Sequence, residues 1–170
     1  IHQAPVETIT QLIEETGIRL IVKEVGQGMG PDSLKALMKL PLAAIEFGAF
    51  GGTNFTKLEM MRSGAKIKKF HEPLSLVGHT AYEMVNMVNE IVEQSGEMQC
   101  NELIISGGIS SFLDGYYLVE KSRLNAIYGQ ASAFLKYANV SYDALYEYIL
   151  SQIRGLEMAA AFLRLKTLDR

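Results

Sequence analysis

The stretch "ELIISGGISSFLDGYYLVEKSRLNAIYGQAS" (residues 102–132) decides the fold class. It opens with an apolar run at 102–108 that is typical of a buried strand and that stops at two glycines. Ser111 is placed to cap a helix at about 113–122, and the run at 126–131 predicts a second strand. Because strands joined by a helix pair in parallel through a right-handed crossover, this stretch predicts an α/β protein.

The same alternation extends through the rest of the chain. It predicts further strands at 19–25 and 43–47, helices at 6–15, 31–40, 81–94, 132–138 and 142–165, and a long, partly helical loop at 48–77. Thr80 and Glu83 form a capping box that starts the helix at 81–94. In the last helix, apolar residues at steps of three and four predict one core-facing stripe: Leu145, Ile149, Ile153, Leu156, Ala160 and Leu163. Gly155 lies inside that helix at a cost of about 1 kcal/mol relative to alanine.

Four strands that alternate with helices amount to about half of a closed (β/α)8 TIM barrel of ~250 residues. The alternative is a doubly wound sheet, whose phosphate-binding glycines follow the first strand as G-x-G-x-x-G. Here the first strand is followed by "GQGMG" (26–30), which has a different spacing. We therefore expect residues 1–170 to form a single domain, the C-terminal half of a barrel.

Composition narrows the class of protein. The chain has 170 residues, 48% of them hydrophobic, a formal net charge of −3 and a single cysteine, Cys100. The charge argues against nucleic acid as a partner, and we interpret the basic segment "KIKKF" (66–70) as a solvated loop. No apolar run approaches the roughly 18 residues of a membrane span, so we expect a cytoplasmic protein without a membrane partner. The start at Ile1 suggests a fragment of a longer protein.

The ends of the third and fourth strands carry the most specific pattern. In (β/α)8 barrels the last two strand ends and a short extra helix commonly bind phosphate. Gly107, Gly108 and Ile109 supply backbone N–H groups with little side-chain obstruction. Ala131 and Ser132 lead into a short helix whose N-terminus favours an anion. The alternative is that these glycines only turn the chain.

The first two strand ends add further candidates. Lys23 lies in an apolar strand that is expected to be buried on both faces, where a lysine needs an anionic partner. In "GGTNF" (51–55) the glycines would admit a ligand close to the backbone, and Thr53 could donate a hydrogen bond to it. Asn54 is expected to cap a turn, and Glu46 to be paired or to face outward.

Other residue types are expected to be structural. His2, His71 and His79 share no metal-ligand spacing, so no metal site is predicted within the chain, and the eight methionines are expected to be packing residues. Cys100 precedes a strand at the end remote from the expected chemistry, which argues against a catalytic thiol.

"VKEVGQGMG", "GGTNF", "SGGI", and "GQAS" followed by "FLK" together resemble, in order and spacing, the C-terminal half of the type 2 isopentenyl-diphosphate isomerases. The resemblance runs along nearly the whole chain. It implies a (β/α)8 barrel that interconverts isopentenyl and dimethylallyl diphosphate with reduced FMN as the acid and base, NADPH as the reductant and Mg²⁺ on the diphosphate. It also implies that Lys23 lies at the flavin pyrimidine edge, that Thr53 contacts the flavin, and that a phosphate clamp consists of Gly107, Gly108, Ile109, Ala131 and Ser132.

Two of the departures from the family pattern bear on the site. The upstream His-x-Asn-x-x-Gln-Glu segment, whose glutamate binds Mg²⁺ in the family, is not among these residues. Where the family often has Asp-x-Ser-Gly, this chain has residues 46–49, "EFGA", which removes a serine hydroxyl near the flavin. We expect a homo-oligomer, and we expect the chain alone to be inactive as an isomerase.

Two alternatives stay open. One is a flavin- or phosphate-binding half-barrel module that works as a homodimer. The other is an FMN oxidoreductase of the hydroxy-acid oxidase type. That enzyme would need a histidine followed by an arginine-bearing segment, and no suitable arginine follows His71 or His79 before Glu102.

Overall fold

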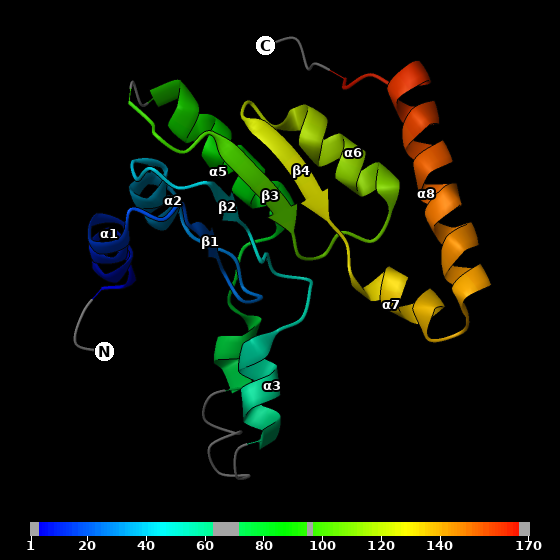
Figure 1. Ribbon diagram of the computed structural model, residues 1–170, viewed down its shortest axis with the longest axis horizontal. Coiled ribbons are helices and arrows are strands. Elements are labelled where there is room, and N and C mark those ends of the chain that lie inside the picture. Colours follow the sequence, from blue (N-terminus) through cyan, green and yellow to red (C-terminus); the bar gives the residue numbers. More distant parts are fainter. Residues whose placement is uncertain (1–3, 63–71, 95–96, 167–170) are drawn as a thin grey trace.

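The computed structural model describes residues 4–62, 72–94 and 97–166 (Figure 1). The basic segment at 66–70, His2 and His71 lie outside the described residues. Within the described part, four parallel strands form one sheet in the order β1-β2-β3-β4. Their bounds are β1 (Ile21–Lys23), β2 (Ala44–Glu46), β3 (Glu102–Ser106) and β4 (Asn125–Gly129). The predicted α/β class and the parallel pairing are confirmed.

Helices separate the strands in sequence, as the alternation predicted. They are α1 (Pro5–Thr16), α2 (Pro31–Met38), α3 (Phe55–Arg62), α5 (Ala81–Gln94), α6 (Phe112–Lys121), α7 (Ser132–Ala138) and α8 (Tyr142–Phe162), with a 3-10 helix η1 (Glu72–Leu76). Figure 1 shows α8 at the outer side of α6, while α3 and the 3-10 segment project away from the sheet near the carboxyl ends of the strands. No described helix combines the length and the apolar character needed to cross a membrane.

Among the described residues, one face of the sheet packs against helices, and the other does not. Ile45 and Phe47 of the second strand region and Leu103 and Ile105 of β3 are buried against apolar side chains of α2 and α5. Burying each such side chain stabilises the fold by about 1.5–3 kcal/mol. Residues between them in sequence point to the opposite face, because side chains alternate along a strand. On that face Ile127 remains 64% exposed.

The strands are shorter than the sequence predicted, and β1 differs in burial. Lys23 was expected in a strand buried on both faces, and this expectation is wrong. β1 lies at an edge of the described sheet, and Ile21 is 56% exposed. The pattern "LIV" indicated apolar character, but it could not indicate how many neighbours the strand would have.

The predicted helix caps at Thr80 and Ser111 are confirmed, because a cap depends only on residues a few positions apart in the sequence. Glu83 accepts hydrogen bonds from the N–H and the hydroxyl of Thr80, and the Glu83 N–H donates to the Thr80 hydroxyl. These bonds hold the pKa of the Glu83 carboxyl below its usual value. At α6, Ser111 and Asp114 form the same reciprocal box.

The stripe predicted for the last helix is right in part: Leu145, Ile149 and Leu156 are half-buried, whereas the other three predicted residues are exposed. Ile153 and Leu163 are 47% and 43% exposed, whereas Gly155 and Ala159 are the buried residues of this helix. A Cβ at Gly155 would lie 2.6 Å from ring atoms of Phe112 in α6. The helix therefore approaches its neighbour through its smallest residues, and its larger apolar side chains are left partly in solvent.

Candidate functional site

The candidate site lies at the carboxyl edge of the sheet, where the loops after all four strands begin. Lys23 pairs in register with Glu46, and Ser106 with Gly129. Because parallel strands point the same way, the loops that follow them emerge at one edge. The structure thus places the predicted residues of different strands at one edge of the sheet, the edge formed by the carboxyl ends of the strands.

Glycines hold the second and third of these loops in contact. A Cβ at Gly52 would lie 3.1 Å from the Cα of Gly107, and a Cβ at Gly51 would lie 3.1 Å from the Cα of Gly108. The two backbones therefore pass each other at a distance that leaves no room for side chains. The first loop joins them, because a Cβ at Gly26 would lie 2.0 Å from the carbonyl oxygen of Thr53. Contact between loops is thus a sufficient reason for these glycines.

The loop after β3 presents backbone donors. Gly107 and Gly108 have φ values of 92° and 74°, which favour glycine. Within the described part of the chain, the N–H groups of Gly107, Gly108 and Ile109 donate to no other residue. Consecutive N–H groups in such a turn form a concavity that suits an anion.

The two N–H groups that follow in this loop are already engaged. The N–H groups of Ser110 and Ser111 donate to Oδ2 of Asp114, at 3.1 and 2.9 Å. The Ser110 hydroxyl donates to the same oxygen, and these bonds hold the pKa of the Asp114 carboxyl below its usual value. The donors available to a ligand are therefore those of residues 107–109.

Gln130 joins the loop after β4 to the loop after β3. Its Nε2 donates to the carbonyl oxygen of Ser110 at 2.7 Å. Its Oε1 is buried and finds no hydrogen-bond partner among the described residues. Ala131 and Ser132 follow and start α7, which has no side-chain N-cap. The loop that leads into these two predicted residues is thus joined to the loop of the predicted glycines, through Ser110.

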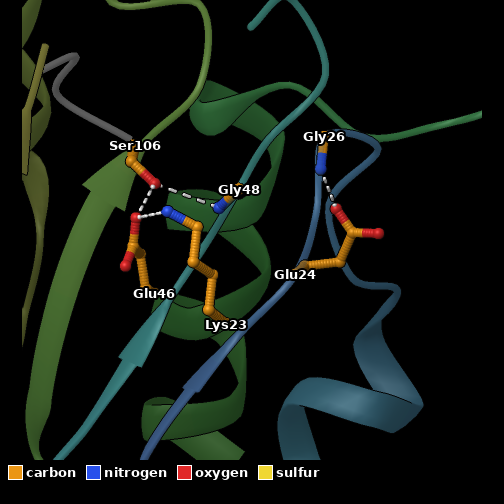
Figure 2. A network of polar contacts seen from close by, with 6 residues as sticks. All are labelled: Lys23, Glu24, Gly26, Glu46, Gly48 and Ser106. Atoms are coloured by element: carbon orange, nitrogen blue, oxygen red, sulfur yellow. Dashed lines mark hydrogen bonds and ion pairs between the residues drawn. The ribbon is translucent and has the colours of Figure 1, made fainter. Parts of the chain in front are cut away.

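A polar chain crosses the sheet beneath the loops (Figure 2). Lys23 Nζ donates to Glu46 Oε1 at 2.5 Å, and the Ser106 hydroxyl donates to the same oxygen at 3.0 Å. The N–H of Gly48 donates to the Ser106 hydroxyl oxygen at 3.1 Å. The prediction that Lys23 needs an anionic partner and that Glu46 is paired is confirmed.

Glu24 was missed by the sequence reasoning. Its Oε2 accepts hydrogen bonds from the N–H groups of Gly26, Gln27 and Gly28 at 2.7, 2.6 and 2.8 Å. Its carboxylate therefore fills the concavity that "GQG" makes, so this loop keeps no donors there for a ligand. A signal existed in the sequence, since an acidic residue directly before closely spaced glycines can accept from their N–H groups.

The segment that carries α3 and η1 is tied to the first loop. Gln27 Nε2 donates to the carbonyl oxygens of Leu74 and Val77, and Gln27 Oε1 accepts from the Thr56 hydroxyl. Asn54 Oδ1 accepts from the N–H of Lys57, which confirms the predicted cap. Thr53 itself is exposed, and its hydroxyl makes no hydrogen bond to another described residue, so its ligand contact stays a prediction.

The cysteine lies away from this edge. Cys100 is buried before β3, and burial raises the pKa of its thiol. Among the residues that the structure describes, no three His, Cys, Asp or Glu side chains gather in a way that could hold a metal ion.

Fold and site together define an α/β protein with a parallel sheet and a polar, glycine-rich loop cluster at the carboxyl ends of its strands. No family model matches the chain. The chain is 31% identical over 165 residues to an isopentenyl-diphosphate delta-isomerase of Bacillus licheniformis. The aligned region covers 95% of this chain and 43% of the relative. A Bacillus pumilus isopentenyl-diphosphate delta-isomerase is 31% identical over 117 residues, 66% of this chain and 33% of the relative.

A Rickettsia akari isopentenyl-diphosphate delta-isomerase is 26% identical over 151 residues, 88% of this chain and 42% of the relative. The chain thus spans less than half the length of each of these curated relatives. The similarity extends over nearly all of this chain, so all four strand ends lie within it.

Proposed function

We propose that this chain is the flavin-binding half of a type 2, FMN-dependent isopentenyl-diphosphate isomerase and forms half of its (β/α)8 barrel. One observation carries the proposal. The N–H groups of Gly107, Gly108 and Ile109, without partners among the described residues, lie at the same sheet edge as the Lys23–Glu46 pair, in a chain similar over 95% of its length to an isopentenyl-diphosphate delta-isomerase.

The residues present fit the cofactor at its phosphate end. The N–H groups of Gly107, Gly108 and Ile109 are free of partners among the described residues, and a phosphate would accept from them. Ala131 and Ser132 would add donors from the adjacent loop, since Gln130 fixes that loop against Ser110. Lys23 would face the flavin pyrimidine edge, and Thr53 is free to donate to the ring.

When bound, reduced FMN would supply the acid and base that shift the double bond of the allylic diphosphate, with NADPH as its reductant. The residues of this chain would bind and orient it. The loops would fix the phosphate, and Lys23 would place a positive charge where the ring becomes electron-rich. Mg²⁺ would hold the substrate diphosphate through residues that this chain does not contain.

The departure at residues 46–49 has a structural reason. Gly48 has a φ of 51°, and a Cβ there would lie 1.9 Å from the carbonyl oxygen of Glu24. A serine therefore does not fit at this position. The Ser106 hydroxyl lies against the Gly48 N–H and provides a hydroxyl at this edge of the sheet.

The test compares FMN with riboflavin, which lacks the phosphate, by quenching of flavin fluorescence on the purified chain. We expect FMN to bind at least about tenfold more tightly, because each hydrogen bond to a charged group contributes about 1.5–3 kcal/mol. Equal affinities would contradict the phosphate site. Isomerisation with FMN, NADPH and Mg²⁺ is assayed in parallel, and we expect none from the chain alone.

A second candidate function is a half-barrel module that works as a homodimer. The observation in its favour is the sheet face without helices, where Ile21 and Ile127 are more than half exposed. Sedimentation separates the candidates. The module is favoured if the chain sediments as a soluble, compact dimer that binds flavin, and if a reconstituted barrel that contains the chain shows no isomerase activity.

A further inference from the structure

The Lys23 ammonium is held by one carboxylate, and that carboxylate is itself held. Glu46 Oε1 accepts from Lys23 and from the Ser106 hydroxyl, and the Gly48 N–H donates to the same hydroxyl. Figure 2 shows these groups at the carboxyl edge of the sheet, with the Lys23 ammonium and the Ser106 hydroxyl both directed at one oxygen of Glu46. The result is a continuous chain of hydrogen bonds from the backbone N–H of Gly48, just after β2, to the ammonium of Lys23 at the end of β1.

Burial differs between the two charged partners. The side chain of Glu46 is 19% exposed, and that of Lys23 is 54% exposed. The carboxylate is thus the fixed member of the pair, and the ammonium is the member that reaches the accessible edge. Parallel register places the two residues directly opposite each other on β1 and β2, so the pairing follows from the sheet.

The neighbouring carboxylate does not compete for the lysine. Glu24 follows Lys23 in sequence, but its Oε2 is occupied by the N–H groups of residues 26–28. Arg19, the other charged residue near β1 in sequence, precedes the strand at its opposite end. Glu46 therefore sets both the position and the local net charge of the Lys23 ammonium.

We infer that Glu46, anchored by Ser106, is a positioning residue that holds the Lys23 ammonium at the cofactor edge and moderates its charge. The inference rests on the proposed function, which places flavin beside Lys23. Without Glu46 the charge of the lysine is uncompensated, and an uncompensated cation favours the electron-rich reduced flavin.

The experiment measures the midpoint potential of FMN bound to the protein that carries this chain, by reductive titration followed in the visible spectrum. Glu46→Gln keeps an oxygen that can accept from Lys23 and removes only the charge. We expect reduced flavin to gain about tenfold in affinity relative to oxidised flavin, a rise of ~30 mV for a two-electron couple. Lys23→Met should lower the potential, because it removes the cation.

Glu102→Gln is the matched control. Glu102 starts β3 at the amino end of the sheet, and its Oε1 accepts from Asn125. The substitution removes the same charge from the same sheet, four residues from Ser106 along the strand, about 13 Å at the usual rise. We expect no change of potential.

The outcomes separate the two claims. If the unsubstituted protein binds no FMN, or Lys23→Met leaves the potential unchanged, the proposed function fails and the inference falls with it. If Lys23→Met lowers the potential while Glu46→Gln matches Glu102→Gln, only the inference is overturned. If Glu46→Gln raises the potential and the rise is smaller in the Lys23→Met background, the inference is supported.

Discussion

Replacing Gly155 by alanine should reveal the conflict between helix propensity and packing in α8. In a helix interior alanine is favoured over glycine by about 1 kcal/mol. A Cβ at position 155, however, would lie 2.6 Å from the Phe112 ring atoms Cε1 and Cζ and 2.8 Å from Cδ1. Carbon atoms prefer separations of about 3.5–4.0 Å, so the ring or the helix must move by about 1 Å.

Overpacking of this kind costs about 1–3 kcal/mol. After the gain in propensity is subtracted, we expect Gly155→Ala to lower the free energy of unfolding by about 1 kcal/mol, which lowers Tm by about 2–4 °C for a chain of this length. The assay is urea unfolding followed by circular dichroism. Ser151→Ala, an exposed position of the same helix, is the control, and it should gain only a few tenths of a kcal/mol.

Removing the Phe112 ring should reverse the sign of the effect of Gly155→Ala on the free energy of unfolding. In a Phe112→Ala background the space is open, so Gly155→Ala should raise the free energy of unfolding by about 1 kcal/mol, which makes the coupling between the two positions about 2 kcal/mol. If Gly155→Ala stabilises the protein equally in both backgrounds, the packing argument for α8 is refuted.

The other predictions concern the loop after β3. Gly107→Ala should cost about 3 kcal/mol or more by urea unfolding, because φ is 92° and the new Cβ would lie 2.1 Å from the Ala49 carbonyl oxygen. Gly17→Ala, with φ 64° and no atom within 4 Å, should cost only the conformational ~1–2 kcal/mol, and equal costs would contradict the role given to loop contact. In the folded state, hydrogen bonds lower the pKa of the Asp114 carboxyl, and the bond from the Ser110 hydroxyl contributes most. The carboxylate therefore stabilises the fold at pH values above its unfolded pKa of ~3.9. This stabilisation is lost as the pH falls through the pKa of the folded state. The stability difference between wild type and Asp114→Asn should therefore shrink between pH 6 and pH 3, and a difference independent of pH would show that the carboxylate is not the stabilising group.

Part of the site was predictable because its parts are local. The glycines after each strand and the caps at Thr80 and Ser111 depend on neighbours in sequence, and all of them lie where they were expected. The sequence predicted that Lys23 has an anionic partner but did not identify it, because the sequence does not show which strand lies beside β1. The partner became identifiable once parallel register placed Glu46 opposite it.

The sequence by itself determined the α/β class, the order of strands and helices, and the edge of the sheet where polar and glycine-rich loops gather. These follow from periodicity and from turn and cap residues, which act over a few positions. Only the tertiary structure decided which face of α8 is buried, that Glu24 fills its own loop, and that Gly51 and Gly52 lie against Gly108 and Gly107. The reason is that such contacts join residues far apart in the chain, and their distances are set by how the backbones pack.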